Sequence, residues 1–282
     1  MKQTPKVAAV HDLSGFGRCS LMVALPVLAA MGNQCCPLPT AYLSAHTACP
    51  CQDRAVFLDM TGQMEGAMEH WAALQVEFDA VYSGFLGSPA QIEVLLRFLS
   101  HFRAERTLVV VDPVMGDHGR RYRTYTPEMC RRMGELAARA DLITPNLTEA
   151  ALLLGEDYAA APKSEREARA WLERLSLGGR RSAVLTGLSL APGAVGAGCY
   201  DRDSGRTSFS MTRAEPGQYP GTGDLFASVV LGCMLRGESL SAAVGRAVEF
   251  VQKCVRRTLL LGTPVVEGVQ FEPLLGELAA QA

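Results

Sequence analysis

The sequence lacks several signals that commonly identify a function. Its nine cysteines form no C-x-x-C pair, so neither a zinc ribbon nor a thioredoxin-type redox site is indicated. It contains no G-x-x-x-x-G-K-[S/T] loop, and no G-x-G-x-x-G follows the first apolar run, which excludes the two commonest nucleotide-binding loops. The formal net charge is only −2 and no long Lys/Arg block occurs, which argues against nucleic acid or an anionic membrane as a partner.

Long hydrophobic runs are also absent. The N-terminal segment MKQTPKVAAV has four consecutive apolar residues before His11, too few for a signal peptide, and no later run has the length of a membrane span. We therefore expect a cytoplasmic protein whose partners are small molecules. The scattered cysteines are expected to be small buried hydrophobic residues, with Cys49 and Cys51 as the pair that could be exposed, because they lie in a polar segment.

What the chain does contain is a regular alternation of strand and helix patterns. Apolar runs such as KVAAV and SAVLTG alternate with amphipathic stretches, and residues 107–111 are apolar or β-branched throughout, as in an inner parallel strand. Residues 195–213 predict an antiparallel hairpin at one edge, and helices are expected at 223–236 and 239–261. With no linker or repeat, the pattern predicts one three-layer α/β/α domain over residues 1–282, built on a mostly parallel sheet with an antiparallel edge.

Polar segments follow several predicted strands, where an open parallel sheet binds its ligands. Asp112 and Asp117 come after the most apolar strand, and Asn146 and Glu149 come after the next. Oxygen ligands at neighbouring strand ends suit a hydrated Mg²⁺. The alternatives remain open at this point: ordinary turn chemistry for the two aspartates, and an N-cap with its capping-box glutamate for Asn146 and Glu149.

The stretch PGTGDLFAS combines a glycine-rich turn with an apolar helical pattern. Unpaired amides at a helix start favour an anion, so Gly221, Thr222 and Gly223 predict a phosphate cradle. Asp224 follows directly, and a carboxylate beside a bound anion is repulsive. It either caps the helix or acts as a base toward a hydroxyl group that attacks the phosphate, and the residues alone leave both interpretations open.

These stretches together resemble a known family. PGTGDLFAS is similar to the signature of the ribokinase-like superfamily of small-molecule kinases. The segments that resemble its pyridoxal kinase branch occur in this order: FGRCS, PLPTAYLSAHT, YSGFLGS, VVDPVMGD and ITPNLTEA. The resemblance extends from His11 to about Leu235. It implies a ribokinase-like fold, ATP as co-substrate, Mg²⁺, K⁺ as a further candidate ion, a homodimer, and phosphorylation of the hydroxymethyl group of vitamin B6.

The resemblance also implies roles for individual residues. Asp224 would be the catalytic base, and the amides of Gly221, Thr222 and Gly223 would stabilise the charge on the transferred phosphoryl group. The residues implied at the alcohol substrate are Asp12, Ser14, His46, Thr47 and Phe85. Those implied around ATP and magnesium are Asp112, Asp117, Asn146, Glu149 and Thr186, with Asp112 and Glu149 nearest the metal.

Two positions depart from the family pattern. Asp12 stands where relatives often have a serine that binds the substrate, and Phe85 stands where many have a tyrosine, so the preferred vitamer is left open. Two other functions also remain open. One is a hydroxymethylpyrimidine kinase, which acts on another flat heteroaromatic alcohol. The other is a nucleotide- or vitamer-binding regulator that keeps the fold without catalysis.

Overall fold

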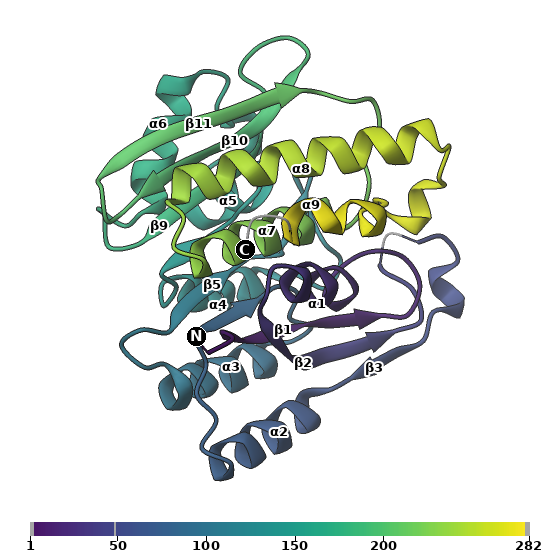
Figure 1. The fold of residues 1–282 in the computed structure, drawn as a ribbon, viewed down its shortest axis with the longest axis vertical. Helices are drawn as coiled ribbons and strands as arrows, with labels where there is room; N and C mark the ends of the chain where they lie inside the picture. Colours follow the sequence, from purple (N-terminus) through teal and green to yellow (C-terminus); the bar gives the residue numbers. More distant parts are fainter. Residues whose placement is uncertain (1–2, 48, 280–282) are drawn as a thin grey trace.

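A nine-stranded sheet forms the centre of the protein in the computed structural model, which describes residues 3–47 and 49–279 (Figure 1). The strand order is β11-β10-β9-β8-β5-β4-β1-β2-β3. The strands are β1 (Lys6–Ser14), β2 (Gln34–Leu43), β3 (Phe57–Asp59), β4 (Ala80–Ser83), β5 (Leu108–Val111), β8 (Leu142–Ile143), β9 (Ser182–Leu188), β10 (Ala194–Asp201) and β11 (Arg206–Arg213). A separate small hairpin pairs β6 (Gly116–Asp117) with β7 (Arg120–Arg121).

Helices cover both faces of the sheet, and each face has its own hydrophobic core (Figure 1). One face carries α1 (Leu21–Ala30), α7 (Thr222–Leu235), α8 (Leu240–Leu260) and α9 (Leu275–Ala279). The other carries α2 (Thr61–Ala73), α3 (Pro89–Phe102), α4 (Pro127–Ala137), α5 (Leu147–Leu154) and α6 (Glu165–Leu175). Strand β1 serves both cores because successive side chains alternate: Val7 packs in the first core, and Ala8 and Val10 pack in the second.

The predicted three-layer α/β/α architecture is confirmed. Six strands from β1 to β9 run parallel, and β10 and β11 add the expected antiparallel edge. Because parallel strands end at the same rim, this topology brings the polar segments after β1, β2, β4, β5, β8 and β9 together.

The structure differs from the sequence-based prediction at two strands. Strand β1 continues to Ser14, so Asp12 and Ser14 lie within it rather than after it, and its register against β2 shifts between His11 and Leu13. The second difference is β3, which follows the polar segment of Cys49 and Cys51 and which the sequence pattern does not predict. It pairs antiparallel with the end of β2 although its side chains are exposed, because edge pairing satisfies backbone groups and requires no buried face.

Two compositional expectations can be compared with the structure. Among residues 3–47 and 49–279, no helix combines the length and the apolar character that crossing a membrane requires. The cysteines are all free thiols, mostly buried or half-buried, as predicted; Cys49 is buried and only Cys51 is exposed. Of the pair that could have been exposed, one residue is therefore part of the interior.

Candidate active site

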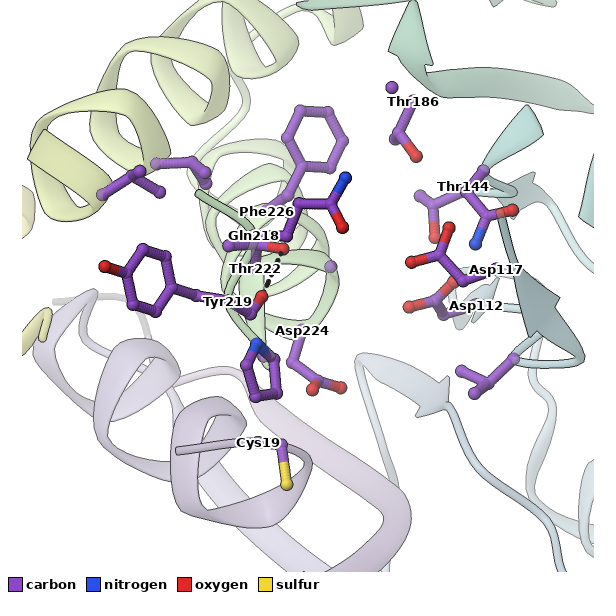
Figure 2. Close-up of a pocket in the computed structure, with 18 of the residues that line it drawn as sticks. Cys19, Asp112, Asp117, Thr144, Thr186, Gln218, Tyr219, Thr222, Asp224 and Phe226 are labelled. Carbon is purple, nitrogen blue, oxygen red and sulfur yellow. Dashed lines mark hydrogen bonds between the residues drawn. The ribbon is translucent and has the colours of Figure 1, made fainter. Parts of the chain in front are cut away.

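A cavity of about 610 Å³ opens at the carboxyl ends of the parallel strands. Figure 2 shows Asp224 on one wall and Asp112 with Asp117 on the opposite wall, facing the same space. Every sequence-predicted site residue except Ser14 lines this cavity. One end is formed by residues that follow β1 and β2, and the other by β10, the segment before α7, and α8.

Asp12 is held by two serine hydroxyl groups at one end of the cavity. Its Oδ2 accepts a hydrogen bond from Ser14 Oγ at 2.9 Å, and its Oδ1 accepts one from Ser20 Oγ at 2.5 Å. Burial raises the pKa of Asp12, while the two hydroxyl donors oppose that rise. Ser14 itself is fully buried and uses its hydroxyl on Asp12, so it lies behind the cavity wall instead of lining it as expected.

Asp224 lies in the first turn of α7 but does not cap that helix. The N-cap is Gly221, in the left-handed region at φ 81°, and Asp224 Oδ2 accepts a hydrogen bond from the backbone N–H of Ser20 at 2.8 Å. The capping interpretation is therefore wrong. Burial, with a smaller contribution from the charge of Asp12, raises the pKa of Asp224 to about 7, the range of a general base that works near neutral pH.

His11 lies beneath this carboxylate. Its Nδ1 is 3.9 Å from Asp224 Oδ1, and the ring is completely buried, in edge contact with Tyr82. Burial lowers the pKa of His11 to about 3, so the imidazole is neutral at neutral pH. It therefore gives Asp224 no positive charge that would lower its proton affinity.

The glycine-rich turn presents backbone amides beside Asp224. The first amide of α7 bonded within the helix is that of Leu225, which donates to Gly221 O at 2.9 Å. The amides of Thr222 and Gly223 precede it, at the positive end of the helix dipole. Gly221 packs against the loop between β1 and α1: a Cβ at position 221 would lie 1.9 Å from the carbonyl oxygen of Arg18. The contact with Arg18 and the positive φ of Gly221 therefore both fix the position of this turn.

Asp112 faces the turn from the end of β5. Its Oδ2 lies 3.9 Å from the position that a Cβ on Gly223 would occupy. Burial and the nearby charge of Asp224 raise the pKa of Asp112 to about 8. A buried carboxylate whose proton affinity is raised by a second carboxylate nearby is in an environment that a cation would stabilise.

Asn146 and Glu149 confirm the capping-box interpretation and also lie at the cavity. The complete capping box lies at the start of α5. The two oxygens of Glu149 accept hydrogen bonds from the backbone N–H groups of Met115, at 3.1 Å, and Asn146, at 2.8 Å. Burial, followed by the charge of Asp112, raises the pKa of Glu149 well above its usual value. The capping box thus fixes a carboxylate at the cavity wall.

The fit of a metal ion to these residues can be judged from the donor set. Within the described part of the chain, no three His, Cys, Asp or Glu side chains lie close enough together to hold a metal by themselves. Asp117 is half exposed, and Glu149 already accepts two backbone hydrogen bonds. This arrangement fits a hydrated Mg²⁺ that takes one protein carboxylate and keeps most of its waters, and it does not fit a closed metal cage.

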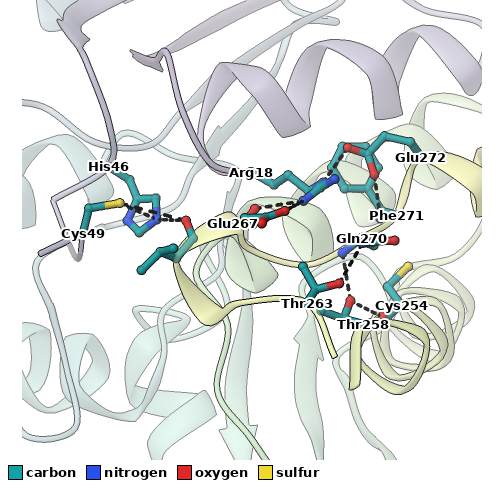
Figure 3. A network of polar contacts seen from close by, with 11 residues as sticks. Arg18, His46, Cys49, Cys254, Thr258, Thr263, Glu267, Gln270, Phe271 and Glu272 are labelled. Atoms are coloured by element: carbon teal, nitrogen blue, oxygen red, sulfur yellow. Dashed lines mark hydrogen bonds and ion pairs between the residues drawn. The ribbon is translucent and has the colours of Figure 1, made fainter. Parts of the chain in front are cut away.

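His46, Thr47 and Phe85 line the same end of the cavity as Asp12. His46 Nε2 lies 2.9 Å from the carbonyl oxygen of Val266 and 3.3 Å from Cys49 Sγ, as Figure 3 shows. A Cβ at Gly17 would lie 2.5 Å from the His46 ring, so the loop after β1 packs directly on it. The imidazole is thus fixed between two segments that are far apart in the sequence.

The other end of the cavity is largely apolar, and sequence reasoning identified only Thr186 there. Its wall includes valines of β10 and α8 and an aromatic ring of α7: Val195, Val248, Val251, Val255 and Phe226. Gln252 donates a hydrogen bond to Glu215 at 2.8 Å at the same end. Valines on an amphipathic helix predict core packing, so no sequence signal distinguished these residues from the buried core.

Comparisons with known proteins agree with this geometry. Residues 44–268 match the family model described as phosphomethylpyrimidine kinase. The chain is 30% identical over 263 residues to a pyridoxine/pyridoxal/pyridoxamine kinase of Bordetella pertussis, covering 89% of each protein. A candidate phosphomethylpyrimidine kinase of Bacteroides thetaiotaomicron, crystallised with pyridoxal, is 41% identical with a TM-score of 0.92, over 98% of this chain and 96% of that one. The pyridoxal kinase of Lactobacillus plantarum is 33% identical with a TM-score of 0.88, over 99% and 98%. The predicted ribokinase-like fold is confirmed.

Proposed function

The chain belongs to the family of phosphomethylpyrimidine kinases and vitamin B6 kinases, and from this premise we propose that it phosphorylates the hydroxymethyl group of pyridoxal, pyridoxamine or pyridoxine with ATP. The observation that carries this proposal is the position of Asp224. It is a carboxylate only 14% exposed and of raised pKa, beside a turn of backbone amides, between a polar and an apolar end of one cavity. A carboxylate so close to an anion site is useful to an enzyme that must deprotonate the hydroxyl group attacking that anion.

The proposed reaction is a direct in-line transfer. Asp224 takes the proton of the hydroxymethyl group while the oxygen of that group attacks the γ-phosphorus of ATP. The bond between the γ-phosphorus and the oxygen that leaves with ADP breaks at the same time. The amides of Gly221, Thr222 and Gly223 stabilise the negative charge on the transferred group. No phosphoenzyme forms, because the attacking oxygen belongs to the substrate.

The residues opposite Asp224 are proposed to bind the nucleotide and its metal. Asp112 would hold a hydrated Mg²⁺, with Glu149 acting through water because its oxygens already accept backbone hydrogen bonds. When bound, the ion would neutralise phosphate charge. Asp117, Asn146 and Thr186 would border the phosphates and the nucleotide. K⁺ is a further candidate ion, for which we propose no ligands.

Asp12, His46, Thr47 and Phe85 are proposed to bind the vitamin. Phe85 offers a ring face for stacking, and the carboxylate of Asp12 would accept from the ring nitrogen, the phenol or an amine. Ser14 is proposed to act only through its hydrogen bond to Asp12.

The test is ADP release with each candidate alcohol. The purified protein with ATP and Mg²⁺ should release ADP when pyridoxal, pyridoxamine or pyridoxine is added, and the 5′-phosphate should form in equal amount. Faster release with hydroxymethylpyrimidine than with any B6 vitamer would favour the thiamine-type kinase instead. If no alcohol stimulated release, the protein would be a binding regulator.

We also propose that the chain is one cytoplasmic kinase domain that forms a homodimer. Support for the dimer comes from β3, which ends the sheet, and from the residue before it. Their apolar side chains are exposed: Val56 by 55%, Phe57 by 49% and Leu58 by 54%. Leu58 lies opposite Tyr42, which is 40% exposed. An exposed apolar edge strand is a surface that a second chain can cover.

A charge placed on this edge should separate the two copies. In sedimentation velocity experiments we expect the wild-type protein to be a dimer and Leu58→Lys to shift toward monomer, because the lysine would have to be desolvated in the interface. Leu74→Lys is the matched control, since Leu74 is 61% exposed at the end of α2. A dimer unaffected by Leu58→Lys would place the interface elsewhere, and a monomeric wild-type protein would contradict the dimer.

A further inference from the structure

Ser20, the residue just before α1, has an unusual backbone conformation. Its φ is 52° and its ψ is −129°, a region that favours glycine. Such a conformation costs stability and persists only where the surrounding structure holds it in place, most often at functional sites. A position of this kind needs an explanation from its contacts.

Those contacts join the two carboxylates of the proposed reaction. The N–H group of Ser20 donates to Asp224 Oδ2 at 2.8 Å, and its hydroxyl group donates to Asp12 Oδ1 at 2.5 Å. Serine before a helix normally uses its hydroxyl to cap the helix, but here the side chain makes no capping hydrogen bond to α1. One buried residue therefore has both of its donors directed at the active site.

The loop that carries Ser20 is fixed from the opposite end of the chain. Arg18 Nε donates to Glu272 at 2.5 Å, and its backbone N–H and its Nη1 donate to Glu267 O at 3.1 and 3.0 Å (Figure 3). The carbonyl group of Arg18 packs against Gly221. The C-terminal segment thus holds the loop against the amide turn, and this contact supports the conformation of Ser20.

We propose that Ser20 is a positioning residue that fixes the carboxylate at the alcohol end, Asp12, relative to the base, Asp224. This inference rests on the proposed function, because the two carboxylates have these roles only in a kinase of this type. The conformation of Ser20 is what allows one residue to reach both: its N–H points toward α7 while its hydroxyl points toward β1.

Two substitutions separate the contributions of the hydroxyl and the backbone. Ser20→Ala keeps the N–H group and the unfavourable φ but loses the hydroxyl, so KM for pyridoxal should rise about 10- to 100-fold, as for the loss of a hydrogen bond to a charged group, with kcat nearly unchanged. Ser20→Gly loses the hydroxyl and also relaxes the backbone. KM should rise equally and kcat should fall as well, because the N–H group no longer holds Asp224, while Tm stays equal or increases.

The chain offers a matched control for the backbone change. Gln75 has φ 53°, is exposed at the end of α2, and lies outside the cavity lining. Gln75→Gly should therefore raise or preserve Tm and leave kcat and KM unchanged. A structural role for Ser20 would instead link lower activity to lower Tm.

The outcomes distinguish this inference from the function on which it rests. If the wild-type protein releases ADP with pyridoxal but both Ser20 variants match its kcat and KM, the positioning role is wrong. It is equally wrong if Ser20→Gly loses activity only because its Tm falls. If the wild-type protein releases no ADP with any alcohol, the proposed function and the inference both fail.

Discussion

Asp224→Asn should lower kcat by about 10³-fold, within the range that general base catalysis contributes. The amide is nearly isosteric and its oxygen can still accept the hydrogen bond from Ser20, so the cavity should keep its shape and KM for ATP should change little. What is lost is the ability to take a proton from the hydroxymethyl group. Steady-state ADP release with saturating pyridoxal measures the effect.

The pH dependence gives this substitution a second readout. A base must be ionised to act, and burial raises the pKa of Asp224 to about 7, so wild-type kcat should fall as pH decreases below about 7 and level off above it. The Asn variant should lose this rise with pH. Asp203→Asn, at an exposed residue of the turn between β10 and β11, serves as the charge-matched control and should behave as wild type. A normal rate for Asp224→Asn would show that another group is the base.

Gly221→Ala should lower kcat by about 10²- to 10³-fold, the cost of displacing a donor that stabilises developing charge. Position 221 has φ 81°, which disfavours any side chain, and a Cβ there would lie 1.9 Å from the carbonyl oxygen of Arg18. Since the backbone of Arg18 is held by the C-terminal segment, the turn itself must move away. Its amides would then no longer be directed at the transferred group.

Gly237→Ala separates this effect from backbone strain. Gly237 has φ 88°, and a Cβ there would have no neighbour within 4 Å. Both variants should therefore lose stability in thermal unfolding, Gly221→Ala the more because of its added clash, but Gly237→Ala should keep the wild-type kcat. Equal kcat values for the two alanine variants would mean that the amide turn does not contact the phosphoryl group.

The architecture was predictable because it depends on local patterns. Apolar runs of strand length, amphipathic stretches of helix length and the Asp/Ser/Gly turn before β11 each follow from short-range periodicity, and their alternation specifies a parallel sheet covered on both faces. The ends of β1 and the existence of β3 were not predictable. A strand end or an edge pairing depends on which backbone groups find a partner across the sheet.

The candidate site was predicted well where a residue type itself carries chemistry. Carboxylates after strand ends and glycines before a helix are visible in sequence, and Asp112, Glu149 and Asp224 all line the cavity. The valines at the apolar end of the cavity were missed because an apolar side chain on α8 is predicted to pack in the core. The sequence pattern is the same whether another side chain or a ligand covers it. Ser20 was missed because a serine in the sequence gives no indication that its backbone has a positive φ.

The sequence by itself determined the fold class, the late glycine-rich turn and the acidic residues around it, since these follow from composition and spacing along the chain. Only the tertiary structure decided which hydrogen bond the Asp224 carboxylate accepts and how strongly it binds a proton. Residues separated by 204 positions meet when the N–H group of Ser20 reaches that carboxylate, which excludes the helix-capping role. Burial, with a smaller contribution from the charge of Asp12, then raises its pKa, and the neutral ring of His11 adds no positive charge to oppose that rise. Proton affinity depends on solvent exclusion and neighbouring charge in three dimensions, and no spacing in the sequence encodes it.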